Sequence, residues 1–251
     1  MPRVHLDELT NWFARAANKS LSDQLVAAYL RGSAARGDNI HGISDVDFYV
    51  IVRDSAFLDA SSKQIMSQSL DTLVQEANVR WAVEKPSFRI VPLSYLKANK
   101  VGRYLTSLEA EILLGSDILT RAARPSSTEL SQFGREEFKR LSDFWTQRES
   151  NVTSFESLSE MAAYKQYVVL KLAQTALFSR GIVALRKQEV PEVFRKEFPT
   201  LDSADVVEKA QRLRETGLGR SLDSELRRFI DEADKFHGIL RVNFTSKKVF
   251  P

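Results

Sequence analysis

The stretch of residues 29–52, YLRGSAARGDNIHGISDVDFYVIV, constrains the fold of this chain more than any other part of it. Two apolar runs, at residues 27–31 and 45–52, are rich in residue types that favour β-strands. The first run ends at Gly32 and Ser33, and a polar loop separates them from the second run. The sequence therefore predicts two strands with a glycine-containing turn at the end of the first.

Two carboxylates, Asp45 and Asp47, open the second predicted strand. Side chains two apart on a strand point to the same face, with about 7 Å of rise between their Cα atoms. Carboxylates placed in this way repel each other unless a cation lies between them. Mg²⁺ usually takes one or two protein carboxylates and completes its shell with substrate phosphates and water. Asp45 and Asp47 are therefore predicted to be metal ligands and catalytic residues, with two surface aspartates as the competing interpretation.

The turn at Gly32 and Ser33 fits the other half of such a site. Glycine lets a phosphate approach the backbone closely, and the serine adds a hydroxyl donor beside backbone N–H groups. Arg36, in the loop that follows, could bind a phosphate through its bidentate fork. A solvated loop arginine is an equally good interpretation of Arg36. The residues predict a triphosphate on this turn.

The stretch resembles the signature of the polymerase-beta-like nucleotidyltransferases: Gly-Ser, a spacer of residues 34–44, then Asp-hydrophobic-Asp. It is most similar to the small bacterial enzymes that transfer AMP to aminoglycosides. This resemblance implies a nucleotidyltransferase domain followed by a helical domain, with Mg²⁺ as the metal and ATP as the substrate.

The resemblance also implies a third carboxylate, on a strand beside the aspartate pair. Such a group helps to hold a second ion or takes the proton of the acceptor hydroxyl. The matching predicted strand begins with Phe88 and Arg89 and carries no acidic residue. Three interpretations stay open: Glu84 reaches the site from the preceding loop, a carboxylate of the helical half such as Glu160 or Glu189 substitutes, or the site catalyses nothing.

A second, weaker resemblance lies in the C-terminal half. Residues 168–181, followed by Arg186 and Lys187, resemble a helix and basic loop of the streptomycin and spectinomycin adenylyltransferases. That resemblance implies that Lys187, or Arg186, reaches the nucleotide phosphates. A surface lysine is the competing interpretation, and it is favoured for Lys165 on the same helix.

The best linker candidate is the segment of residues 121–128, after which strand signals fade. We expect an α/β nucleotidyltransferase-like domain with a mixed sheet at residues 1–122 and an all-α helical bundle at residues 123–251. The substrate cleft is expected between them. The predicted strands are residues 27–31, 45–52, 79–83 and 88–93, and the predicted helices are residues 6–17, 61–77, 105–114, 130–145, 157–180, 191–198, 203–214 and 221–236.

Composition narrows the class of partner. The chain has 251 residues, with 36 basic and 33 acidic side chains and a net charge of +3, so anionic ligands are permitted. No concentrated basic stripe is present, which makes a nucleic-acid partner unlikely. There is no cysteine, no apolar signal core at the N-terminus and no apolar run of the ~20 residues that a membrane helix needs. We expect a cytoplasmic protein without a membrane segment.

The predicted function is metal-dependent transfer of a nucleoside monophosphate, most simply AMP from ATP, to a hydroxyl of a small molecule or other acceptor. The alternative is a catalytically degenerate nucleotidyltransferase fold that acts as a nucleotide-binding or regulatory protein. Transfer to RNA ends is a further alternative, disfavoured by the weak net charge.

Overall fold

The computed structural model of the chain consists of two compact units, Met1–Pro125 and Ser126–Pro251. The division between them falls within the segment of residues 121–128, where the sequence predicts a linker. The residues that the structure describes are 3–39, 44–81, 85–120, 122–150, 155, 157–201 and 204–245.

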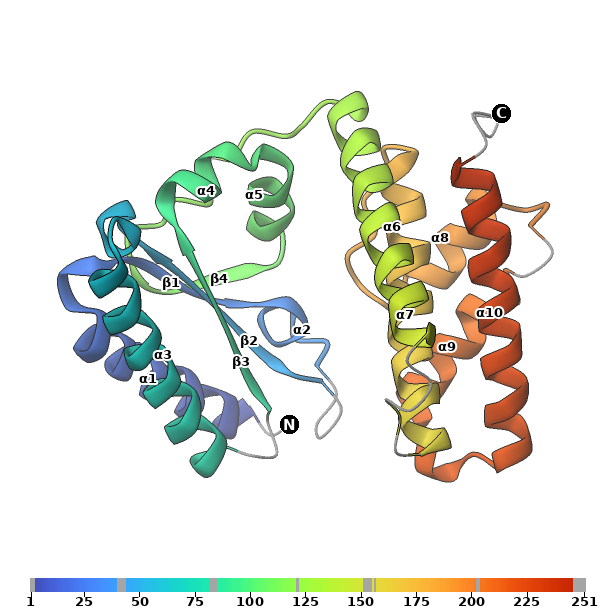
Figure 1. Cartoon of the computed structure of the whole chain (residues 1–251), viewed down its shortest axis with the longest axis horizontal. Helices are drawn as coiled ribbons and strands as arrows, with labels where there is room; N and C mark the ends of the chain where they lie inside the picture. The colour runs from blue at the N-terminus through green and yellow to red at the C-terminus, as the bar shows by residue number, and fades with distance from the viewer. Residues whose placement is uncertain are drawn as a thin grey trace. The chain divides into compact units, whose positions relative to one another are not determined.

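The described part of the first unit is built on a four-stranded mixed sheet with strand order β3-β2-β1-β4 (Figure 1). Its strands are β1 (Leu25–Arg31), β2 (Val46–Val52), β3 (Pro86–Pro92) and β4 (Ala110–Gly115). Strand β1 runs antiparallel to β2 and β4, whereas β2 and β3 are parallel. A parallel pair needs a crossover connection, and the helix α3 (Ala60–Arg80) lies in the one between β2 and β3. The predicted α/β class with a mixed sheet is confirmed.

One face of the sheet packs against α3 and against α1 (Arg3–Leu21). Val46 and Phe48 of β2 are buried on this face, where Phe13 of α1 stacks on Phe48 with 3.9 Å between ring centroids. Each large apolar side chain buried in this way contributes about 1.5–3 kcal/mol. Because strand side chains alternate, this core fixes the register of β2 and turns Asp47 to the opposite face.

The opposite face is apolar only over part of its area. Tyr29, Tyr49 and Ile51 are buried there, and the short helix α4 (Leu93–Ala98) packs on them through Leu96. Toward the start of β2 the face becomes polar, because Asp47, two residues before Tyr49, is the neighbouring residue of β2 on this face. The candidate site lies at this polar end.

The helix predicted at residues 105–114 is wrong in its second half. The helix α5 (Lys100–Ser107) ends early, and β4 begins after the two residues Leu108 and Glu109. Periodicity alone cannot distinguish a short apolar run such as residues 112–114 in a strand from the same run in a helix, and pairing with β1 decides for a strand. Gly115 has a φ of +86° and ends β4 where a Cβ would overlap the carbonyl oxygen of Val26.

The strand predicted at residues 79–83 is wrong in its described part. Helix α3 continues through Arg80, and Trp81 follows as its C-cap residue. The β-branched Val79 favours a strand, but it lies in the last helical turn and is 88% exposed, so no sheet packs against it. The positive charge of Arg80 is favourable at the C-terminus of a helix. Residues 82 and 83 lie outside the described part of the chain.

The second unit is all-α in its described residues, which confirms the predicted helical domain. Helix α7 (Leu158–Ser179) is its centre, and most of the side chains of this helix are buried. The Ser157 side chain caps α7 by accepting a hydrogen bond from the N–H of Glu160, and Gly181, with a φ of +76°, follows the helix as predicted. The helices are α6 (Ser127–Ser150), α7 (Leu158–Ser179), α8 (Val190–Glu197), α9 (Asp205–Thr216) and α10 (Asp223–Thr245).

Lys165 of α7 is not the surface lysine that the sequence favoured. Its side chain is buried, forms an ion pair with Asp234 of α10 and lies over the ring of Trp145, 4.9 Å from the centroid. A buried ammonium group requires such a partner, because an uncompensated charge is costly away from water. The partner is far away in the sequence, so helix periodicity alone could not reveal it.

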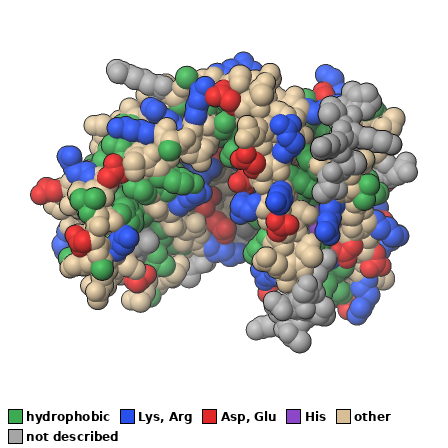
Figure 2. Space-filling model, turned by 45° about the horizontal axis from the view of Figure 1, so that its top comes forward, with side chains coloured by type: hydrophobic (Ala, Val, Ile, Leu, Met, Phe, Trp, Pro, Cys, Tyr) green, Lys and Arg blue, Asp and Glu red, His purple; other side chains and the backbone are tan. Residues whose placement is uncertain are grey.

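No helix in the described part of the chain is both long and apolar enough to cross a membrane. Basic and acidic side chains are interspersed on the face of the molecule shown in Figure 2.

Candidate functional site

The two aspartates lie at the start of β2, on the face opposite to α1 and α3. Asp47 is part of the strand, where it is paired with Arg31 of β1 and with Ser87 of β3. Asp45 stands just before the strand and is exposed, while Val46 between them is buried in the core on the other face. Strand alternation therefore brings the two carboxylates to one face, as the sequence predicts.

The surroundings of Asp47 disfavour its negative charge. Burial raises the pKa of this carboxyl, and the nearby charges of Asp45 and Glu109 raise it further. The hydroxyl of Ser87 donates a hydrogen bond to Asp47, and this bond and the positive charge of Arg31 act in the opposite direction on the pKa. A carboxylate held in this way without full compensation is suited to binding a cation.

Gly32 directly follows β1 and lies beside Asp47. Its φ is +70°, a conformation that other residues rarely adopt, and its N–H donates a hydrogen bond to the carbonyl oxygen of Glu109 at 3.0 Å. A Cβ at this position would lie 3.0 Å from Oδ2 of Asp47. The space beside the Cα of Gly32 is thus taken by the aspartate, so the glycine has a role in placing the carboxylate. Ser33 follows it in α2 (Gly32–Arg36).

Arg36 is not a solvated loop arginine. Its side chain is only 12% exposed, and its Nη1 donates a hydrogen bond of 2.6 Å to Oε2 of Glu109. Its Nη2 lies 3.3 Å from Oδ1 of Asp38. On the other side of Glu109, Nε of Arg31 donates a 3.0 Å hydrogen bond to Oε1. Glu109 therefore bridges two arginines next to the aspartate pair.

The sequence does not indicate a role for Glu109, because this residue falls inside the helix predicted at residues 105–114. It lies just before β4, and its side chain is 13% exposed. If the apolar run at residues 112–114, which ends at Gly115, is interpreted as a strand, Glu109 lies at the start of an edge strand beside β1. That reading requires the pairing of β4 with β1, which the local sequence does not specify.

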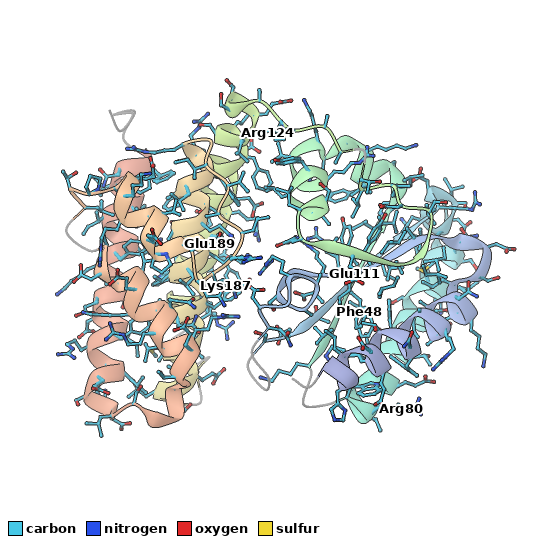
Figure 3. The ribbon with its side chains drawn as sticks, turned by 180° about the vertical axis from the view of Figure 1, so that it is seen from behind. Phe48, Arg80, Glu111, Arg124, Lys187 and Glu189 are labelled. Carbon is cyan, nitrogen blue, oxygen red and sulfur yellow. The ribbon has the colours of Figure 1, made fainter. Side chains whose placement is uncertain are left out.

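We expect Glu109→Gln to destabilise the first unit by about 1–3 kcal/mol, because two arginines would lose the charge that compensates them in a mostly buried cluster. Urea unfolding measures the change. Glu111→Gln is the matched control, since it removes the same charge from an exposed position of β4 (Figure 3). Equal unfolding midpoints for the two variants would contradict a compensating role of Glu109.

The strand expected to carry the third carboxylate does not carry one. In β3, Phe88 faces the core and packs against Phe48, with 5.4 Å between ring centroids. Ser87 and Arg89, at alternate positions, face the aspartate side, and Arg89 lies in the same sheet as the aspartates, as predicted. Glu84 lies outside the described residues.

The remaining candidates belong to the second unit. Lys187 lies in the segment between α7 and α8, with its ammonium group 5.0 Å from the centroid of the Tyr167 ring (Figure 3). Glu189 ends the same segment, and its Oε1 lies 3.8 Å from Nε of Arg186. Oε1 of Glu160, in α7, lies 4.0 Å from Nη2 of Arg148. Each of these contacts joins two residues of the second unit.

The carboxylates of Asp45 and Asp47 fit one magnesium ion. No cluster of three or more acidic, histidine or cysteine side chains suited to a metal occurs among the residues that the structure describes. Asp45 and Asp47 are close enough for the charge of one to act on the other. A pair of hard oxygen ligands suits Mg²⁺ when phosphate oxygens and water complete the shell.

Comparison with known proteins supports the fold. No protein-family model matches the chain, and no curated protein matches it. Among solved structures, the chain is similar to a spectinomycin adenyltransferase, AAD(9) from Enterococcus faecialis, solved with ATP and spectinomycin. The TM-score is 0.62 at 13% sequence identity, over 93% of this chain and 98% of the other. The chain thus has the fold of a small adenyltransferase, with a nucleotidyltransferase-like α/β domain followed by a helical domain.

Proposed function

We propose that this protein is a Mg²⁺-dependent nucleotidyltransferase that moves AMP from ATP to a hydroxyl of a small molecule and releases pyrophosphate. The observation that carries the proposal is the placement of Asp47 beside Gly32, with the charge of Asp45 close enough to act on it. The similar fold of an adenyltransferase solved with ATP and spectinomycin supports both the nucleotide and a small acceptor. We also infer that the protein acts in the cytoplasm, where it would find ATP.

Each residue of the site has a role in this proposal. Asp45 and Asp47 would hold Mg²⁺, which when bound neutralises charge on the triphosphate and stabilises the in-line transition state. The Ser87 hydroxyl orients the Asp47 carboxylate, and Gly32 leaves the space that this carboxylate needs. Ser33 supplies a hydroxyl donor for the phosphates. Glu84 stays the sequence-based candidate for the group that accepts the proton of the acceptor hydroxyl.

The test is the release of pyrophosphate from ATP with Mg²⁺ across a panel of hydroxyl compounds. We expect release that depends on one class of acceptor and that is lost in Asp45→Asn. The mutation removes a charged ligand at an exposed position, so the variant should fold. If the protein neither binds ATP nor releases pyrophosphate with any acceptor, the proposal is wrong.

A second candidate function is nucleotide binding without catalysis. The observation that favours it is the content of β3, where Ser87 and Arg89 stand on the aspartate face and no carboxylate does. Tight Mg²⁺-dependent binding of ATP without pyrophosphate release on any acceptor would select this candidate.

A further inference from the structure

Arg89 is a cation placed beside the candidate metal site. In the register of β2 and β3, Ser87 is opposite Asp47 and Arg89 is opposite Tyr49. Residues two apart on a strand share a face, so the arginine projects on the aspartate side one pair further along the strands. Strand β3 is at the edge of the sheet, and Arg89 is exposed.

A second guanidinium, that of Arg31 on β1, lies over the same Tyr49 ring, and β1 and β3 flank β2 on opposite sides. The Cζ of Arg31 lies 5.5 Å from the centroid of the Tyr49 ring, and the Cζ of Arg89 lies 5.9 Å from the same centroid. Tyr49 itself is 4% exposed, so its ring is a fixed support for both cations. The hydroxyl of Tyr95, in α4, lies 3.5 Å from Nη2 of Arg89 and adds a further polar group.

The two arginines differ in how their charge is compensated. Arg31 forms an ion pair with Glu109 at 2.9 Å. Arg89 forms no ion pair with an acidic side chain in the described part of the chain. A guanidinium without a carboxylate partner offers donors in a fork that matches a phosphate.

We propose that Arg89, together with the Tyr95 hydroxyl, forms an oxyanion subsite that binds a phosphate group of a substrate on the face of the sheet that carries Asp47. The phosphate belongs either to the polyphosphate of the nucleotide or to a phosphorylated acceptor. In both cases the subsite disfavours an acceptor that presents a protonated amine at this position, because the guanidinium of Arg89 repels it. The assignment to a substrate rests on the proposed nucleotidyl transfer, whereas the oxyanion subsite itself does not.

The test measures binding of inorganic pyrophosphate by calorimetry in EDTA, so that the aspartates and Mg²⁺ are not required. The wild-type protein should bind pyrophosphate, and Arg89→Ala should weaken this binding about tenfold, the effect of losing one charged hydrogen-bonding partner. Arg89→Lys should recover only part of the affinity, since lysine lacks the bidentate fork. Arg15→Ala is the matched control, because Arg15 is an exposed arginine on α1, which packs on the opposite face of the sheet.

Addition of ATP distinguishes the two sources of the phosphate. If ATP displaces pyrophosphate competitively, the subsite holds the nucleotide polyphosphate. If the Arg89-dependent affinity for pyrophosphate persists with ATP saturating, the subsite holds a phosphate of the acceptor. No pyrophosphate binding by the wild-type protein, or equal affinities in wild type and Arg89→Ala, would overturn the subsite. Neither result depends on turnover, so failure here is separate from failure of the proposed transfer.

Discussion

Replacing Asp47 by Asn should weaken Mg²⁺-dependent ATP binding by at least about 100-fold and, in the same protein, raise the stability of the ligand-free fold. The binding effect follows from the loss of a charged metal ligand. The stability effect follows from the surroundings of Asp47, where burial and the charges of Asp45 and Glu109 disfavour the carboxylate. Asn keeps the shape and carries no charge.

The pH dependence has a definite sign. The pKa of Asp47 in the folded protein is raised above its ordinary value of 3.8, chiefly by burial. The stability that Asp47 contributes is therefore fully present below the unfolded pKa and is lost as the pH rises through the folded pKa. Above the folded pKa the ionised Asp47 opposes folding. The advantage of Asp47→Asn over wild type should be present above the folded pKa and shrink as the solution is acidified below it.

Thermal unfolding in EDTA across this pH range measures the stability effect, and calorimetry with Mg²⁺ and ATP measures binding. Asp45→Asn is the comparison, because Asp45 is exposed and its charge is solvated. It should lose affinity as well, but gain little stability. If Asp47→Asn binds Mg²⁺ and ATP as the parent protein does, the metal site is assigned to the wrong residues.

The parts of the fold that the sequence predicts are those set by local rules. Alternation in β2 separates Val46 and Phe48 from Asp45 and Asp47, and this alternation is present in the sequence itself. The long buried pattern of α7, with a serine before it and Gly181 after it, likewise determines a helix from local signals. In these segments packing and local preference agree.

The parts that the sequence misses depend on partners far along the chain. Glu109 acquires its role from Arg31 and Arg36, which precede it by 78 and 73 residues. The strand that follows Glu109 forms because β1 has an open edge beside it, and a short apolar run does not specify that pairing. Arg89 was predicted in the sheet, but its position against Tyr49 depends on the register of two strands that the crossover helix separates.

The substitution Gly32→Val should abolish Mg²⁺-dependent ATP binding, because two separate costs coincide at this residue. A φ of +70° costs a residue with a Cβ about 1–2 kcal/mol. A Cβ would also lie 3.0 Å from Oδ2 of Asp47, so the carboxylate has to leave its place. Calorimetry with Mg²⁺ and ATP measures the binding, and urea unfolding measures the stability.

Gly37 separates the two costs. Its φ of +73° is nearly the same, and among the described residues no atom other than those of its chain neighbours lies within 4 Å of the Cβ position. Gly37→Val should therefore lower stability through the backbone term and leave ATP binding intact. In an Asp47→Ala background the carboxylate is gone, so the additional stability cost of Gly32→Val should fall to that of Gly37→Val. If the cost of Gly32→Val is unchanged in that background, Gly32 acts only as a turn residue. If the cost falls, the glycine is needed because Asp47 occupies the space that a side chain would take.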